Sequence, residues 1–415
     1  MRTLETNWVV TGTSLEEFKK VLQEKEKSTV FNTCKSDELS LASVYEVTDE
    51  DFKVVRLYGN SSQAYSPFKE APISIVKKDD LRNAGATEEL IREIEEQKIF
   101  YFDANQNIVL VGDNLDYVQF GLSGEFFAKP SLERDLAIAK AFQKKKPVTL
   151  ICRKKNGVKK IFALRSGSYT PIPNDNIFEV LDAVNENNAL GEAKVVRWEI
   201  NNRITRIWVK FPEVSKEIND IYCELDELVP GLMIETSDTG DCAFRVQECW
   251  YFGSADIHHT SISRKHSGDV DMTALLQKCE SKIFSKFTKL PERLLDLLCL
   301  DLGVKAYDEK SQKENKIRYE EYFTEISKHI GLVKAVGKKM EVAIREQLLN
   351  EYDGKRSFSA YDLVMSFMYL PDRIWSSDEK KQKYAVEQLK DVVFQAAFYD
   401  FQPLDDEDEV ILLPR

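Results

Sequence analysis

The sequence predicts an α+β protein with a mixed N-terminal region, a β-hairpin-rich middle sheet and an α-helical C-terminal region. Alternating, β-branched segments separated by turn residues run through the first 260 residues. Helical spacing of apolar residues takes over from about residue 261. The composition, 43% hydrophobic and 31% charged, is that of a globular chain with a packed core. We therefore expect three parts, with bounds at residues 1–130, 131–260 and 261–415.

In the N-terminal part, Ser14 begins an S-x-x-E capping box, and apolar residues follow it at helical spacing. This predicts a first helix over residues 14–25. The turn residues 48–51 separate two alternating segments, which predicts a hairpin. A helix after Thr87 and a hairpin with its turn at 103–107 complete this part of the prediction, and a helix over 131–145 then leads into the first hairpin of the middle part.

The middle part opens with the pair Asn156-Gly157, which favours a type I′ turn between two strands. The ladder around that turn places Lys154 opposite Lys159 and Arg153 opposite Lys160. Opposed like charges destabilise a sheet. Two explanations stay open: an anion such as a nucleic-acid phosphate neutralises the cluster, or the side chains separate in water and pair with acidic residues from elsewhere.

A helix after Ile177, ending by Gly191, leads to a second hairpin. If Asn201-Asn202 is its two-residue loop, Arg197 lies opposite Arg206, so the opposition of like charges repeats. Trp198 and Trp208 could offer stacking surface there, although tryptophans in strands more often belong to a core. A third strand pair is predicted around the turn 237–241. The C-terminal part is predicted to be helical over 275–303, 317–352, 359–370 and 383–401, with a charged connection at 305–316 and an acidic tail.

Charge and cysteine content narrow the class of protein. The net charge of −12 argues against a protein that coats nucleic acid indiscriminately, while a local basic patch remains compatible with it. Seven scattered cysteines without a CxxC pair indicate reduced thiols. No run approaches 18 consecutive apolar residues, and the first residues have no secretory pattern. We expect a cytosolic protein, in a bacterial host, without a membrane partner.

No residue pattern declares a reaction. The thiol and imidazole side chains between residues 242 and 266 include zinc-ligand types, but their spacing is not that of a structural zinc site. Cys249 lacks a recognisable orienting Asn or Asp for nucleophilic catalysis. Acidic residues at 238, 241, 269 and 271 leave a metal-dependent hydrolase as a weaker alternative. We expect no cofactor, no metal and no catalytic residue, and His266 is either part of a phosphate site before a helix or of an exposed connection.

Four loose motifs carry a family resemblance. They are Tyr169-x-x-Ile172-x-Asn174-x-x-x-Phe178, Ser237-x-x-Gly240 before an alternating strand, Arg264-Lys265-His266-x-Gly268, and the helical segment 358–370 with 387–394. Together they span about residues 169–395. The chain resembles the uncharacterised family described as phage/plasmid-like proteins, a domain of unknown function. It departs from that family at 249–253, where Cys-Trp-Tyr-Phe-Gly replaces Cys-x-Asn-Gly, and it lacks a small-residue pair near the last helix. The resemblance implies an origin in a phage, prophage or plasmid and no particular mechanism.

The leading functional expectation is a non-enzymatic accessory protein of a mobile element that binds nucleic acid, single-stranded DNA or RNA, through basic hairpins. The alternative is a self-assembling virion component or a protein that binds a phage or host factor, and we expect a homo-oligomer. The predicted anion-binding residues are Arg153, Lys154, Lys155, Lys159, Lys160, Arg197, Arg206, Arg264, Lys265 and His266. The predicted stacking residues are Phe162, Tyr169, Trp198 and Trp208.

Overall fold

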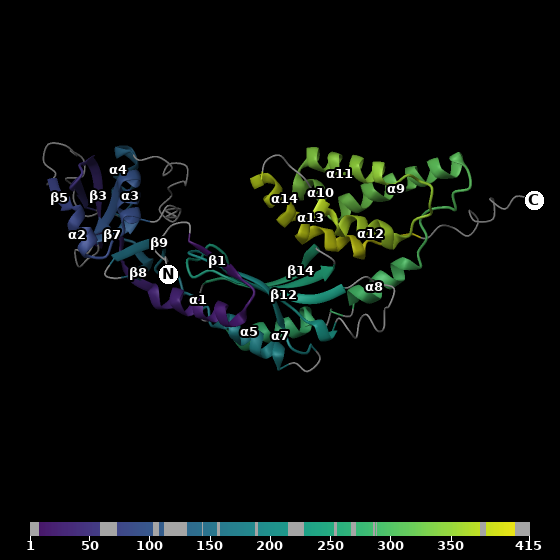
Figure 1. Cartoon of the computed structure of the whole chain (residues 1–415), viewed down its shortest axis with the longest axis horizontal. Helices are drawn as coiled ribbons and strands as arrows, with labels where there is room; N and C mark the ends of the chain where they lie inside the picture. The colour runs from purple at the N-terminus through teal and green to yellow at the C-terminus, as the bar shows by residue number, and fades with distance from the viewer. Residues whose placement is uncertain are drawn as a thin grey trace, which may run out of the picture.

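The structure is a computed structural model, and it describes residues 8–58, 73–102, 108–111, 131–142, 144–155, 158–186, 190–214, 228–252, 255–266, 271–284, 287, 289–373 and 379–402. These residues form two β-sheets and a group of C-terminal helices, which confirms the α+β class. Figure 1 shows them as a curved arrangement. The N-terminal sheet lies at one end, the C-terminal helices lie at the other, and the second sheet lies between them.

The N-terminal sheet has eight strands in the order β2-β8-β9-β7-β6-β3-β4-β5. Their bounds are β2 Thr29–Lys35, β3 Ser40–Val47, β4 Asp51–Tyr58, β5 Ile73–Lys77, β6 Ile99–Phe102, β7 Ile108–Val111, β8 Pro147–Lys155 and β9 Val158–Ser166. Only the β7–β9 pair is parallel among these neighbours. The three predicted hairpins in this region are confirmed, and the turn at 103–107 lies outside the described residues.

Helices cover both faces of this sheet. The helix α4 (Leu132–Phe142) packs Ile138 and Phe142 against one face. On the other face, α2 (Lys78–Asn83) and α3 (Glu88–Gln97) bury Leu81 and Leu90. Thr87 caps α3 as its side chain accepts a hydrogen bond from Leu90 N, which agrees with the predicted helix start. The sheet therefore has two separate apolar cores, one on each side.

The middle sheet has six antiparallel strands in the order β1-β10-β11-β12-β13-β14. Their bounds are β1 Val9–Gly12, β10 Lys194–Asn201, β11 Thr205–Lys210, β12 Leu228–Thr236, β13 Phe244–Phe252 and β14 Ala255–Arg264. The strand pair around 237–241 is confirmed as β12 and β13. We did not predict β14, because its apolar residues, Ile257 and Ile262, are too few and too far apart to give an alternating pattern.

The predicted register of the β10–β11 hairpin is wrong. Arg197 lies opposite Trp208, and Arg206 lies opposite Glu199, so arginine does not face arginine. The reason is the turn: the Asn201 side chain accepts hydrogen bonds from the backbone N–H groups of Arg203 and Ile204, both at 2.8 Å. Asn201 N also donates to Ile204 O at 3.0 Å. The two loop residues are therefore 202 and 203, one step later than expected.

Two helices connect the sheets. The helix α1 (Leu15–Ser28) follows β1 and leads into β2, with Ser14 as the predicted cap. The helix α5 (Asn176–Asn185) lies between β9 and β10 and ends before the expected Gly191 stop. The chain thus crosses from one sheet to the other twice, and β8–β9 belongs to the first sheet while β1 belongs to the second. The expected division at residue 131 does not coincide with the division between the sheets.

The C-terminal part is helical, as predicted. Its elements are α7 Met272–Lys282, α8 Lys289–Leu298, α9 Glu309–His329, α10 Leu332–Val336, α11 Lys338–Glu351, α12 Ala360–Met368, α13 Leu370–Arg373, α14 Glu379–Val392 and the 3-10 helix Val393–Phe398. The expected connection at 305–316 is mostly the start of α9, which Asp308 caps. Few apolar residues mark that start, so helical spacing could not reveal it.

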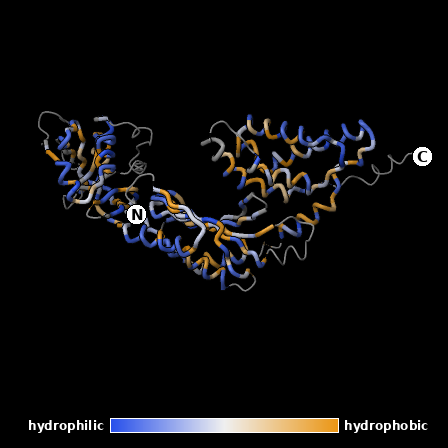
Figure 2. Tube along the Cα trace, viewed as in Figure 1, coloured by the Kyte–Doolittle hydropathy of each residue, from blue (hydrophilic) through white to orange (hydrophobic). Residues whose placement is uncertain are grey.

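One continuous core joins the middle sheet to these helices. It includes Trp198 and Trp250 from the sheet together with Leu294 and Phe367 from the helices. Figure 2 shows hydrophobic residues along α12, whereas the outer helices α9 and α11 are largely hydrophilic. Among the described residues, no helix is both long and apolar enough to cross a membrane.

Candidate polar site between the two sheets

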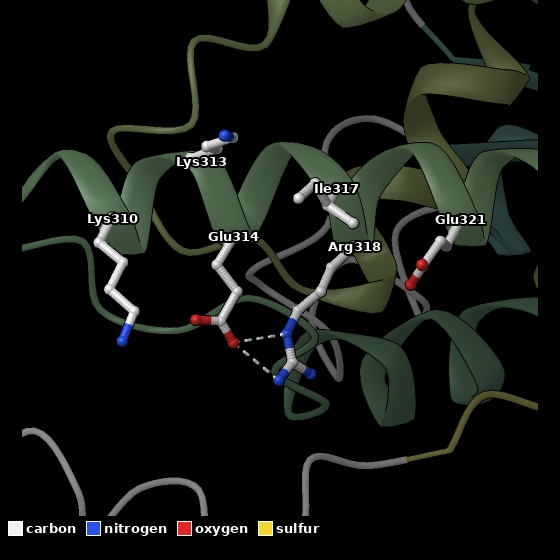
Figure 3. Close-up of a pocket in the computed structure, with 6 residues that line it drawn as sticks. All are labelled: Lys310, Lys313, Glu314, Ile317, Arg318 and Glu321. Atoms are coloured by element: carbon white, nitrogen blue, oxygen red, sulfur yellow. Dashed lines mark hydrogen bonds and ion pairs between the residues drawn. The ribbon is translucent and has the colours of Figure 1, made fainter.

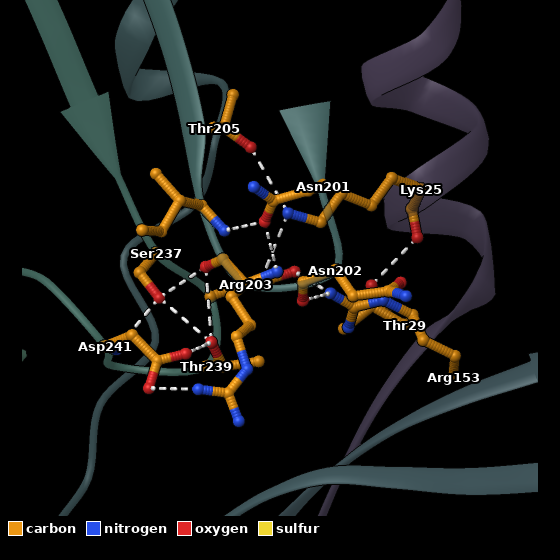
Figure 4. A network of polar contacts seen from close by, with 12 residues as sticks. Lys25, Thr29, Arg153, Asn201, Asn202, Arg203, Thr205, Ser237, Thr239 and Asp241 are labelled. Atoms are coloured by element: carbon orange, nitrogen blue, oxygen red, sulfur yellow. Dashed lines mark hydrogen bonds and ion pairs between the residues drawn. The ribbon is translucent and has the colours of Figure 1, made fainter. Parts of the chain in front are cut away.

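A network of buried polar and charged side chains lies where one end of the middle sheet meets β8 and α1 (Figure 4). The turns 201–204 and 237–243 project from that end of the sheet. They meet Arg153 from the predicted basic hairpin and Lys25 from α1. We call this region the sheet junction. It brings together residues from four segments that are far apart in the sequence.

Three charged side chains are fully buried at the sheet junction. The Arg153 guanidinium pairs with the Asp238 carboxylate at 2.8 Å and also donates to Asn202 O at 2.9 Å. Lys25 Nζ lies 3.4 Å from Asp238 Oδ1 and donates to Thr205 Oγ1 at 3.2 Å. Two cations therefore share one anion, and the cluster carries an excess positive charge.

The electrostatic consequences follow from burial. Burial lowers the pKa of Lys25 to about 8, because Asp238 offsets only part of the lost hydration and Arg153 repels the ammonium charge. Burial alone would raise the pKa of Asp238, but the two cations hold it below its usual value. The Nε and Nη1 atoms of Arg153 have no hydrogen-bond partner in the part of the chain that the structure describes. The cluster is thus incompletely paired, and costly to bury.

The turn after β12 holds Asp238, the anion of this cluster, in place. Ser237 Oγ donates to Arg203 O at 2.6 Å and accepts from Asp241 N at 3.0 Å. The carboxylate of Asp241 in turn pairs with Arg165 at 3.1 Å and with Arg203 at 3.5 Å. Gly240 has φ +75°, and a Cβ there would meet the Tyr169 ring at 2.8 Å. A turn of this shape therefore requires glycine at that position.

Tyr169 and His266 close the junction from the other side. Their rings stack at 5.3 Å between centroids. Tyr169 OH donates to Asp238 O at 2.8 Å, and His266 Nε2 lies 2.9 Å from Cys242 O, so Nε2–H donates there. Burial lowers the pKa of His266, which favours the neutral ring at pH 7. Three of the four motifs behind the family resemblance, at 169–178, 237–240 and 264–268, thus contribute residues to one site.

Several predicted binding residues are buried rather than displayed. Arg153 and Lys160 lie opposite each other as expected, but Lys160 pairs with Glu93 of α3 just as Arg153 pairs with Asp238. The second explanation given for the opposed charges, pairing with acidic residues from elsewhere in the chain, accounts for Arg153 and Lys160. Both cations also approach the ring of Phe162, which is itself 5% exposed. Lys154 is exposed and Lys159 is half-buried, while the side chain of Lys155 is outside the described set.

The two predicted tryptophan platforms are also core residues. Trp198 is 2% exposed, and its indole N–H donates to Ser14 O at 2.9 Å. Trp208 is 7% exposed and lies under the Arg197 guanidinium, 4.4 Å from its ring centroid. These rings have no free face for stacking on a base.

A set of cationic side chains nevertheless gathers at the same end of the middle sheet. We call it the cationic rim; it consists of Arg203, Arg206, Arg245, Arg264 and Lys265. The ladder sets Arg206 and Arg245 on either side of Glu235, and both pair with that carboxylate. Glu199 also lies opposite Arg206, Glu387 also acts on that arginine, and Asp241 pairs with Arg203, so described carboxylates balance part of the charge of the rim. Arg264 and Lys265 are exposed at the end of β14.

A second polar cluster lies where α14 packs against the middle sheet. Cys249 and His258 lie directly opposite each other on β13 and β14. The Asp256 carboxylate is 3.3 Å from His258 Nε2 and 2.5 Å from Lys390 Nζ of α14. Burial lowers the pKa of His258, but Cys249 and Asp256 outweigh this and raise it to about 10. Asp256 thus contacts the imidazole of His258, which lies opposite Cys249, and the sequence did not reveal this contact.

This cluster does not have the form of an open active site. Cys249 is fully buried, so a substrate has no access to its thiol. Among the described residues, no group of three or more His, Cys, Asp or Glu side chains is arranged to hold a metal ion. The arrangement instead ties α14 to the sheet by an ion pair.

Two hollows lie in the C-terminal helices. One, of about 540 Å³, follows the exposed face of α9, where Arg318 pairs with Glu314 one turn away at 3.0 Å (Figure 3). The other, of about 480 Å³, is bordered by α9, α11 and the segment 352–359.

Comparison of the chain with protein-family models, curated proteins and solved structures finds no match. The family resemblance therefore stays a prediction.

Proposed function

We propose that the protein binds single-stranded nucleic acid at the cationic rim. The observation that carries the proposal is the convergence of cations from three segments, 201–206, 245 and 264–265, at one end of one sheet. On a chain of net charge −12, such a local gathering of cations would attract a polyanion to one place, so that the polyanion would not coat the molecule.

The cations of the rim lie at separate places along the end of the sheet. Arg206 and Arg245 both reach the Glu235 carboxylate between them, whereas Arg264 and Lys265 lie at the end of β14, so a phosphate backbone would contact these two places at different phosphates. Binding rests on charge and not on base stacking, because the predicted tryptophans belong to the core. We therefore expect little sequence preference and a strong dependence on salt.

The test is titration of a labelled 20-nucleotide single strand at several salt concentrations, followed by fluorescence anisotropy. The wild-type slope of log K against log salt should report roughly 0.7 ions per phosphate contacted. Changing Arg245→Gln together with Lys265→Gln should flatten that slope by about one unit or more. The matched control, Lys338→Gln with Lys339→Gln on α11, removes the same charge from an exposed site far from the rim.

Two outcomes would refute the proposal. One is the absence of binding even at about 50 mM salt. The other is an equal loss of affinity in the rim variant and in the α11 control, which would mean that net charge alone governs association.

A second candidate function, self-assembly, is favoured by the sheet edges. Within the described part of the chain, the strands β1 and β2 each pair on one side only, and they expose Val9 (53%) and Phe31 (40%). Open edge strands are templates for pairing with another chain. Sedimentation of the pure protein as a defined oligomer, which Val9→Lys or Phe31→Lys dissociates, would favour this function. We also propose an origin in a phage, prophage or plasmid, on the basis of the family resemblance. We propose a cytosolic location on the basis of the composition.

A further inference from the structure

The hollow of about 480 Å³ among the C-terminal helices has an aromatic wall. Tyr319 and Tyr352 stack with centroids 4.6 Å apart and 18° between the ring planes. Phe358 packs edge-on against both of them. Tyr319 and Phe358 are buried, whereas Tyr352 is only half-buried. The outermost ring of the stack, Tyr352, lines the hollow and is the least buried of the three, and the volume falls within the roughly 300–1,000 Å³ usual for small-molecule sites.

The segment 352–359 at the mouth of this hollow is held rigidly. The buried Asn315 side chain donates to Val304 O at 2.9 Å and to Gly354 O at 3.3 Å, and accepts from Val304 N at 2.8 Å. Gly354 has φ +75°, and a Cβ there would lie 2.4 Å from Gln312 O. A surface segment fixed this firmly can present a side chain in one place, which is how rigid scaffolds carry binding residues.

That side chain is Arg356. It lines the hollow, it is exposed, and its guanidinium has no hydrogen-bond or ion-pair partner among the described residues. Its backbone carbonyl, by contrast, is fixed, because it accepts from Tyr352 OH at 2.7 Å. The rigid segment therefore holds an unpaired fork of N–H donors beside an aromatic ring.

The carboxylates around the hollow already have partners. Glu351 pairs with Arg373 at 3.1 Å. Asp362 accepts from Ser359 N at 2.8 Å and so caps α12. Asp353 accepts from Lys355 N at 2.9 Å. The carboxylates of Asp353 and Asp362 keep their negative charge, because a backbone N–H does not neutralise a carboxylate. Arg356 is the lining cation without a partner among the described residues, and its guanidinium can form charge-assisted hydrogen bonds with an anionic group.

We propose that this pocket binds a nucleotide, with the base stacked on Tyr352 and the phosphate on Arg356. A planar heteroaromatic ring that bears a phosphate matches both features at once. The same chemistry is offered by a free mononucleotide and by the 5′-phosphorylated end of a strand. The inference does not rest on the cationic rim, which lies at the middle sheet.

The test is isothermal titration of the full-length protein with the four nucleoside 5′-monophosphates, with the matching nucleosides, and with inorganic phosphate. At least one monophosphate should bind with a Kd below about 1 mM, and its nucleoside and phosphate alone at least tenfold more weakly. Arg356→Gln should weaken the monophosphate at least tenfold and leave the nucleoside unchanged, because only the phosphate contact is lost. Tyr352→Leu should weaken both ligands. Lys338→Gln, at the far end of α11, is the matched control and should change neither.

A second arm compares single strands with a 5′-phosphate and a 5′-hydroxyl end. If Arg356→Gln weakens binding of the phosphorylated strand alone, the ligand of the pocket is a strand end. If the variant weakens binding of mononucleotides alone, the ligand is the free nucleotide. The proposal is overturned if no monophosphate or phosphorylated end binds at 5 mM, or if Arg356→Gln binds them as the wild type does. Arg356 is exposed, so this variant should fold normally, which its melting temperature checks. The rim variant should leave mononucleotide binding unchanged, which separates a failure here from a failure of the rim proposal.

Discussion

Replacing Lys25 by methionine tests whether the sheet junction holds an unfavourable buried charge. Methionine keeps much of the length of the side chain and removes its ammonium group. Asp238 keeps its ion pair with Arg153 at 2.8 Å, so no carboxylate is left uncompensated. The cost is the hydrogen bond from Lys25 Nζ to Thr205 Oγ1, which is worth about 1 kcal/mol.

The magnitude follows from the pKa of Lys25, which burial lowers from 10.5 to about 8. One pKa unit corresponds to about 1.4 kcal/mol, so the charged form is disfavoured by roughly 3 kcal/mol. The folded-state pKa lies below the unfolded value, and between about pH 8 and 10.5 the unfolded state therefore binds more protons. Stability must rise with pH through that window. Between pH 7 and pH 9.5 the wild type should gain about 2 kcal/mol that Lys25→Met does not gain.

The assay is urea denaturation of both proteins at pH 7, 8, 9 and 9.5, with the difference in unfolding free energy plotted against pH. Other groups that titrate in this range contribute to both proteins and cancel in the difference. At pH 7 the variant should be at least as stable as the wild type, because a buried charge is replaced by an apolar side chain. Parallel curves for the two proteins would refute the reasoning, since Lys25 would then have an ordinary pKa.

Three further predictions concern the middle sheet. Asp256→Asn should destabilise the protein by about 3 kcal/mol, because Lys390 and His258 lose their carboxylate; hydrogen exchange should then accelerate first in α14. The His258 imidazole should show no titration by NMR between pH 5 and 8, because its pKa is raised to about 10; its stabilising contribution is complete below pH 6.5 and is lost as the pH rises through 10. Gly231→Ala should cost about 1–3 kcal/mol or more in chemical denaturation, because the new Cβ would lie 2.2 Å from Val209 O.

Local patterns predicted local structure well. Asn156-Gly157 predicted the β8–β9 register down to the facing cations, because a two-residue turn sets the register of its own strands. The Asn201-Asn202 pair misled by one residue, because the Asn201 side chain forms the turn itself and its hydrogen bonds are not visible in composition. The periodicity of apolar residues predicted the α+β fold class and the C-terminal helices. The strand β14 has too few apolar residues to show an alternating pattern.

The site could not be predicted, because its partners are distant in the sequence. Arg153 and Asp238 are 85 positions apart, and Lys25 and Thr205 are 180 apart. The like charges of β8 and β9 do face each other, as the sequence predicted, but the carboxylates that pair with Arg153 and Lys160 come from other segments. The three motif segments that meet at the sheet junction gave no sign in the sequence that they share one site.

The measurement that tests the central claim most directly is a hydrogen-exchange footprint of the protein with and without a single-stranded oligonucleotide at low salt. The account predicts protection of the backbone around the cationic rim, at 201–206, 244–246 and 262–266, and its loss when salt is raised. Unchanged exchange at the rim, with protection of some other surface such as the open face of α9, would contradict it.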